Sequence, residues 1–140
     1  MRAFTLACRR PDGTWPAYWW RGRHYSTFWN CRALRLLDPQ QPLELAPGFA
    51  DGIASAFELA CALGATALAG RPDAQLKARL LALQSPDGSW AGAANLRVTH
   101  PACFRPWEQA HGDYYADHNR LVTSAAALDV LTLLAAEPKE

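Results

Sequence analysis

The sequence predicts an all-α fold, and three observations support that prediction. Alanine (27 residues) and leucine (19 residues) make up a third of the 140-residue chain, whereas isoleucine and valine together number four. Alanine and leucine favour helices, while strands favour β-branched residues. Apolar residues recur at helical spacing, and a turn that stops a helix occurs twice. We therefore expect a single helical domain over residues 1–140.

Five helices follow from the apolar pattern and the stop signals. Asp73 precedes the fourth helix and is a typical N-cap. Leu76, Leu80 and Leu83 then form one apolar stripe. The final helix is almost uncharged, which indicates that other helices surround it. The expected bounds are residues 4–8, 27–37, 52–69, 74–84 and a final helix from His118 or Asn119 to about residue 136.

The stop signal belongs to an internal repeat. Arg-Pro-Asp-Gly-Thr-Trp at residues 10–15 matches Ser-Pro-Asp-Gly-Ser-Trp at residues 85–90, 75 positions later. Proline ends the preceding helix, aspartate accepts backbone N–H bonds, glycine supplies a positive φ and the indole packs against helix ends. Each turn leads through a loop to a helix, and the second loop is longer by about 21 residues. We divide the chain into repeat one, residues 1–50, and repeat two, residues 51–140.

Charge and cysteine content exclude several classes of protein. Fourteen basic and 13 acidic residues give a net charge of +1, which argues against a general nucleic-acid binder. The four cysteines form no Cys-x-x-Cys pair, and the N-terminal apolar run is too short for a secretory signal. An apolar stretch at residues 52–70 carries Glu58 near its middle, so we expect a buried helix rather than a transmembrane segment. These features predict a cytoplasmic protein without a transmembrane segment or a nucleic-acid partner.

The repeated turn resembles the repeats of the terpenoid cyclase and protein prenyltransferase superfamily, which includes squalene–hopene cyclases. Leu-Gln-Ser-Pro-Asp-Gly-Ser-Trp at residues 83–90 carries the closer match, and residues 10–16 carry a weaker one. Thr-Ser-Ala-Ala-Ala-Leu at residues 123–128 resembles the start of an inner helix, and the whole resemblance covers nearly the entire chain. It implies an α/α toroid, in which two layers of helices surround an aromatic-lined cavity for isoprenoid chains.

The chain is short for a complete toroid of that family. A full ring has about twelve helices, so we expect a partial α/α toroid of roughly five helices with exposed apolar edges. A second copy or a partner subunit would cover those edges. Residues 1–37 carry seven arginines and one acid, a balance of +6 that leaves −5 for the rest of the chain. We expect this basic part to meet an anionic ligand or the acidic part of a second copy.

The family's acid motif is absent. Protonating cyclases of this family carry Asp-x-Asp-Asp before an inner helix, whereas the corresponding residues here are Asn-Arg-Leu-Val at 119–122 and Arg-His-Tyr-Ser at 23–26. The zinc ligands of the protein prenyltransferases have no convincing match either. A zinc site is conceivable on ligand types, but the spacing fits no standard pattern, so we expect no metal and no cofactor. Its ligands would be His100, Cys103, His111 and His118.

The long second loop, residues 91–117, is the first candidate site. Asp113, Asp117 and His118 precede the final helix, where the family's cavity opens. A histidine near an aspartate can serve as a general acid or base, which makes these three the candidate catalytic residues. The alternative is that Asp117 or Asn119 caps the final helix and that His118 is a surface residue.

The second candidate site is a segment dense in aromatic residues and arginine, residues 15–29. Aromatic faces attract cations, and arginine binds phosphate or carboxylate with a fork of donors. The segment could form one wall of an isoprenoid pocket, or it could fill a toroid end or a subunit interface. The candidate substrate-binding residues are Trp19, Trp20, Arg21, His24, Tyr25 and Trp29, with Tyr114 and Tyr115 from the long loop.

These features predict a small terpenoid-cyclase-like protein that binds a hydrophobic polyene or isoprenoid-derived substrate in an aromatic-lined cavity. The resemblance implies cyclisation or rearrangement of that substrate without the Asp-x-Asp-Asp motif. The alternative is a non-catalytic half-toroid that dimerises or caps a partner biosynthetic enzyme. Glu58 is expected to pair with Arg32 or Arg35, although an unpaired buried carboxylate would be a conceivable acid.

Overall fold

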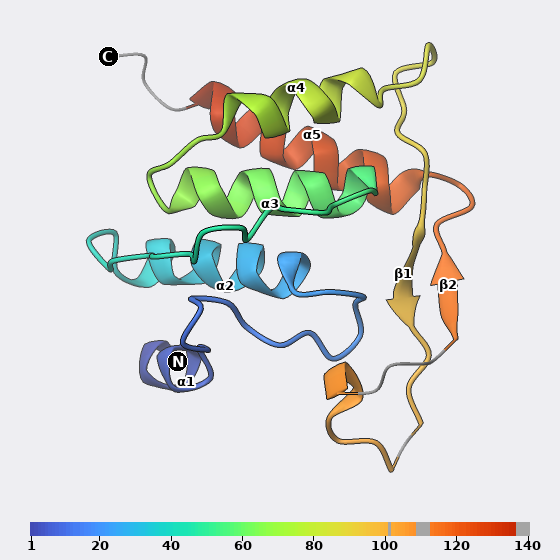
Figure 1. The fold of residues 1–140 in the computed structure, drawn as a ribbon. Coiled ribbons are helices and arrows are strands. Elements are labelled where there is room, and N and C mark those ends of the chain that lie inside the picture. Colours follow the sequence, from blue (N-terminus) through green and yellow to red (C-terminus); the bar gives the residue numbers. More distant parts are fainter. Residues whose placement is uncertain (101, 109–112, 137–140) are drawn as a thin grey trace.

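The structure, a computed structural model, describes residues 1–100, 102–108 and 113–136 (Figure 1). The prediction of an all-α partial toroid of five helices is confirmed, with a small two-stranded sheet in addition. The elements are α1 (Arg2–Ala7), α2 (His24–Leu37), α3 (Ala56–Leu68), α4 (Ala74–Ala82), β1 (Ala94–Arg97), a 3-10 turn (Pro106–Glu108), β2 (Tyr114–Ala116) and α5 (Leu121–Ala136).

Three helices run side by side in the same direction, with α3 between α2 and α5 (Figure 1). The fourth helix, α4, packs on α3 and runs the opposite way, and α1 packs on α2. The N-terminal ends of α2, α3 and α5 therefore face the same side of the molecule, where the β1–β2 hairpin lies. In this arrangement a site at that end can draw residues from three helices and the hairpin.

The central helix α3 is the core of this arrangement. Ten of its 13 residues are buried, so it has no open face. Its small residues allow close packing, because a Cβ atom added at Gly64 would lie 2.5 Å from the Phe28 ring. The helix begins at Ala56 and not at residue 52 as predicted, because the Ser55 hydroxyl accepts the backbone N–H of Glu58 at 3.2 Å.

Both copies of the repeated turn make the same hydrogen bonds. The indole N–H of Trp15 donates to the Thr5 carbonyl over 2.7 Å, and that of Trp90 donates to the Leu80 carbonyl over 2.7 Å. The two acceptor residues are 75 positions apart in the sequence, and so are the two tryptophans, as the sequence repeat predicts. Each indole thus ties its turn to the helix before it.

The repeat also extends beyond the turn into the next helix. Trp15 donates its backbone N–H to the Thr27 hydroxyl, and Trp90 donates to the Ser124 hydroxyl. These hydroxyls are 97 positions apart. The structure therefore matches Thr27 with Ser124 rather than with Thr123, and the second loop is longer by 22 residues because 97 exceeds 75 by that number.

The extra length of the second loop forms the hairpin that the sequence did not predict. β1 and β2 pair antiparallel, with Leu96 opposite Tyr115 and Arg97 opposite Tyr114. An isolated bridge joins Leu96 to Trp20, so the hairpin is fixed against the segment that leads into α2. Within the described part of the chain, no helix combines the length and the apolar character needed to cross a membrane.

Candidate functional site

Aromatic side chains around α2 and α3 form the wall of an open pocket. The Trp20 ring stacks on Tyr25 and on Phe57, with ring centroids 4.3 and 4.8 Å apart. Trp29 continues the wall along α2, with its centroid 6.2 Å from that of Tyr25. The pocket has a volume of about 360 Å³, a size typical of ligand sites. Its lining residues are Trp20, Tyr25, Phe28, Trp29, Phe57, Cys61, Val122, Ala125, Ala126 and Asp129.

One ion pair lies at the edge of this aromatic pocket. Arg32 donates from Nη1 to Asp129 Oδ2 at 2.5 Å, and Asp129 is a lining residue. The Arg32 guanidinium also lies 5.1 Å from the centroid of the Trp29 ring. Carboxylate and indole together hold the guanidinium in place. The pocket is otherwise apolar, so it suits a hydrophobic ligand.

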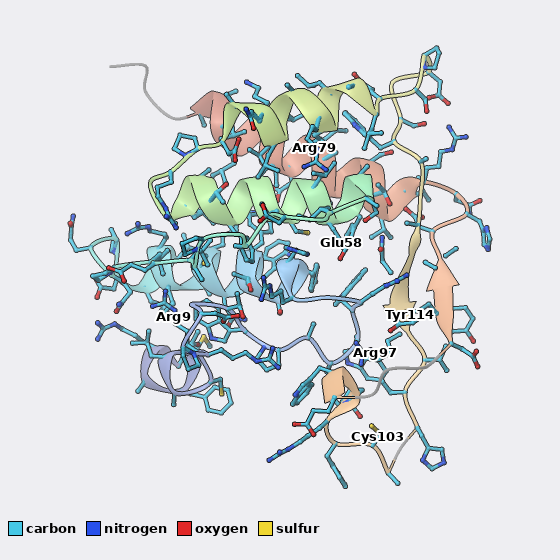
Figure 2. All side chains as sticks on the ribbon, in the orientation of Figure 1. Arg9, Glu58, Arg79, Arg97, Cys103 and Tyr114 are labelled. Carbon is cyan, nitrogen blue, oxygen red and sulfur yellow. The ribbon has the colours of Figure 1, made fainter. Side chains whose placement is uncertain are left out.

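Glu58 lies near the N-terminal end of α3 (Figure 2), where it contacts His24 and lines a larger cavity of about 570 Å³. His24 Nε2 lies 3.0 Å from the Phe49 carbonyl, which accepts only, so that nitrogen carries a proton. The other nitrogen, Nδ1, faces Glu58 Oε1 at 3.4 Å, and Ser55 donates its hydroxyl to Glu58 Oε2. The contact with His24 does most to lower the pKa of Glu58, while burial opposes that shift.

Glu58 is therefore partnered, but not by an arginine. The prediction that it pairs with Arg32 or Arg35 is wrong, because the first binds Asp129 and the second donates to the Leu68 carbonyl. His24 reaches Glu58 from the first turn of α2 because the N-terminal ends of α2 and α3 lie side by side. The sequence gives no direct signal for this pairing, since 34 positions separate the two residues.

Two arginines hold Tyr114 on the hairpin. The Arg21 guanidinium lies 5.4 Å and the Arg97 guanidinium 5.9 Å from the centroid of the Tyr114 ring. Figure 2 shows Arg97 and Tyr114 close together on the hairpin. Tyr115, on the opposite face of β2, lines a small cavity together with Trp20. The predicted aromatic residues of the long loop thus lie next to those of the first repeat.

The three candidate catalytic residues differ in their surroundings. Asp117 accepts the backbone N–H of Thr123 at 2.8 Å and so caps α5, and it also lines the small cavity with Trp20. Asp113 and His118 are exposed to solvent. The helix starts at Leu121, later than predicted, and Arg120 before it has a positive φ of 61°.

Two more of the predicted substrate-binding residues, Trp19 and His24, lie outside the aromatic pocket. Trp19 is 56% exposed and meets Tyr18 edge-on, and His24 is buried beside Glu58. Of the conceivable zinc ligands, His111 lies outside the described residues. Among the residues that are described, no three His, Cys, Asp or Glu side chains come close enough together to hold a metal ion.

Sequence reasoning missed several lining residues of these cavities. Phe57 and Cys61 are four positions apart on α3, a spacing that places them on one helix face toward the aromatic pocket. Asn95 and Thr123 line the small cavity at the hairpin. The helical spacing of the first pair could have identified them, whereas nothing in the sequence distinguishes Asn95.

Solved structures with this fold include proteins about twice as long as the chain. A protein from Actinoplanes is 30% identical with a TM-score of 0.80, over 93% of this chain and 48% of its own. The type II terpene cyclase MstE from Scytonema is 25% identical with a TM-score of 0.72, over 95% of this chain and 50% of its own. A variant of that cyclase in complex with its substrate, geranylgeranyl dihydroxybenzoate, is 24% identical with a TM-score of 0.69, over 92% and 47%.

Neither the models of known protein families nor the curated proteins include a match to this chain. The chain spans about half the length of the solved structures that it matches. Over that half it has a terpene-cyclase-like fold.

Proposed function

We propose that the chain binds a prenylated or polyene ligand in the aromatic pocket and takes part in its cyclisation or rearrangement. The observation that carries this proposal is the stacked wall of Trp20, Tyr25 and Phe57, in a fold shared with a type II terpene cyclase. Aromatic faces attract positive charge, so such a wall suits a substrate that passes through a carbocation. The assignment of the repeat to the squalene–hopene type is part of this proposal. The prenylated substrate bound by the MstE variant supports the proposed class of ligand.

Cyclisation of a polyene requires a proton donor and a proton acceptor. Protonation of one alkene carbon leaves a carbocation, a second alkene attacks it to close the ring, and loss of a proton then gives an isomer of the substrate. Asp117 borders the small cavity beside Trp20 and already accepts an N–H bond, which suits it to the acceptor role. The proton donor would be Asp113 or His118, the two exposed candidates.

Incubation with squalene and geranylgeraniol, followed by mass spectrometry, tests the reaction. We expect products of unchanged mass and new retention time. Asp117→Asn should remove them without lowering the melting temperature, because asparagine caps helices as well as aspartate does. Asp51→Asn, at an exposed site, is the matched control. Absence of any isomer with the wild-type chain contradicts catalysis by this chain.

The second candidate function, a half-toroid that dimerises, is supported by the open face of α5. Both α3 and α5 are highly apolar, but α3 is covered on both sides whereas Leu121 and Leu128 of α5 are 71% and 55% exposed. A helix with apolar residues all round is normally enclosed. We propose that a second copy covers this face of α5 and completes the apolar enclosure.

Sedimentation velocity tests the dimer. Leu128→Glu should convert a wild-type dimer to monomer, because it places a charge within the proposed apolar interface. Leu36→Glu is the matched control, since Leu36 is 81% exposed near the end of α2. A wild-type chain that sediments as a monomer at high concentration contradicts the proposed dimer but leaves the ligand proposal standing.

A further inference from the structure

A smaller cavity adjoins the aromatic pocket. It lies between the β1–β2 hairpin and the first turn of α5 and has a volume of about 200 Å³. Trp20 and Val122 line both spaces, so the two meet across these side chains. A ligand whose chain occupied the aromatic pocket would therefore have its end near this small cavity.

Two polar side chains that line the small cavity are buried, those of Asn95 and Thr123. Asn95 is 5% exposed. Thr123 is 0% exposed, and its hydroxyl oxygen Oγ1 has no hydrogen-bond partner among residues 1–100, 102–108 and 113–136. Buried polar groups are almost always hydrogen-bonded, because an unpaired one lowers stability. The unpaired Thr123 hydroxyl, with the Asn95 carboxamide in the same cavity lining, points to a polar group that binds between them.

The first repeat shows what the same hydroxyl does when it is only structural. Ser26 is the counterpart of Thr123, 97 positions earlier, as Thr27 is of Ser124. The Ser26 hydroxyl contacts two carbonyl oxygens, that of Trp15 at 2.7 Å and that of Arg23 at 3.0 Å. In the second repeat the equivalent hydroxyl, that of Thr123, has no partner among the described residues and lies at the small cavity. The difference between the copies is therefore local to the cavity.

The lining of the small cavity indicates the chemistry of its ligand. Asp117 is its one charged side chain among the described residues, so an anionic group would be repelled. A hydroxyl can donate to the Asp117 carboxylate or the Asn95 oxygen, and it can accept from the Asn95 amide or the Thr123 hydroxyl. A cavity of about 150 Å³ is known to hold benzene, so a cavity of this size takes a single ring.

We propose that the small cavity binds the hydroxyl-bearing head group of the ligand, a phenol or an alcohol, through Asn95 and Thr123. This inference rests on the proposed function, since the prenyl chain of the same ligand lies in the aromatic pocket. It adds that the substrate is amphipathic and neutral at its head, and it makes Asn95 and Thr123 specificity-determining residues.

Two probes separate the head from the chain, namely geranylhydroquinone and geranylbenzene, which differ only in the ring hydroxyls. We expect calorimetric titration to show tighter binding of the hydroquinone. Thr123→Val and Asn95→Leu should each weaken binding of the hydroquinone roughly threefold to tenfold, the usual range for one hydrogen bond, and leave that of geranylbenzene unchanged.

Urea unfolding supplies a readout that does not depend on the ligand. Thr123→Val should leave stability unchanged or raised, because the wild-type hydroxyl has no partner in the described structure. Ser26→Ala, the matched control, should lower stability because its hydroxyl is bonded. Equal affinity of the two probes, or equal destabilisation by the two variants, overturns the head-group inference alone. Failure of both probes to bind overturns it together with the ligand proposal.

Discussion

Arg32 on α2 and Asp129 on α5 occupy equivalent positions in the two repeats and bind each other, with 2.5 Å between Nη1 and Oδ2. Their separation of 97 positions is the same as that of Arg23 and Arg120, which pair with the aspartates of the two turns. The two helices therefore carry opposite charges at one matched position. That difference links α2 to α5 at the edge of the aromatic pocket.

A double-mutant cycle on this pair should give a small coupling energy. The two side chains are 33% and 38% exposed, so we expect about 0.2–1 kcal/mol from Arg32→Gln and Asp129→Asn. Urea unfolding at low and high salt measures it, and added salt should reduce it. A coupling that does not fall with salt would contradict the partly exposed geometry.

The two turn tryptophans should contribute alike to stability. Trp15→Phe and Trp90→Phe each leave a buried carbonyl without its indole donor, which costs about 1–3 kcal/mol in addition to the lost packing. The free energy of unfolding in urea measures both losses. Trp19→Phe, at a 56% exposed site, is the control and should change little. A large effect in one copy and none in the other would contradict the structural equivalence of the turns.

Gly64→Ala should destabilise the chain although alanine favours helices. Replacing glycine by alanine within a helix usually gains about 1 kcal/mol. Here the new Cβ would lie 2.5 Å from the Phe28 ring and 3.0 Å from Val130. The overpacking penalty of about 1–3 kcal/mol should therefore exceed the gain in helix propensity. Thermal unfolding gives the sign directly. A raised melting temperature would show that α2 and α3 do not pack as closely as the structure has them.

Glu58 should make the chain sensitive to acid. Its pKa is lowered in the folded chain, chiefly by the contact with His24, so its contribution to stability is complete above the ordinary value of 4.5. The contribution is lost as the pH falls from that value through the lower, folded pKa. Glu58→Gln should therefore flatten the fall in unfolding free energy over this acidic range, and Glu44→Gln, at an exposed site, should not. Identical pH profiles for wild type and Glu58→Gln would contradict the pairing.

The sequence predicts the helices and the repeat well because these depend on local features. Asp73 caps α4 as expected, accepting the N–H groups of Gln75 and Leu76. The hairpin was not predicted because Ala94–Arg97 and Tyr114–Ala116 are short, and their pairing depends on the Trp20 segment beside them. Contacts across the long loop have no local signal.

The candidate site is predictable only in part for the same reason. The aromatic run places Trp20, Tyr25 and Trp29 in one region, and helical spacing on α2 brings the last two to one pocket. Trp19 is mostly exposed although it is next to Trp20, because neighbouring residues in an extended segment point to opposite sides. The sequence does not show which of the two points inward. Nor does the sequence show that His24 contacts Glu58 and does not line the aromatic pocket.

The most direct test of a prenyl-binding aromatic pocket is calorimetric titration of farnesol into the wild-type chain and two tryptophan variants. Trp29→Ala removes a wall of the pocket, and Trp19→Ala removes a tryptophan of similar exposure outside it. We expect saturable binding that Trp29→Ala weakens about tenfold or more, since burial of a large apolar side chain is worth about 1.5–3 kcal/mol. Trp19→Ala should leave the affinity unchanged. Absence of saturable binding, or equal loss in the two variants, would contradict the proposal.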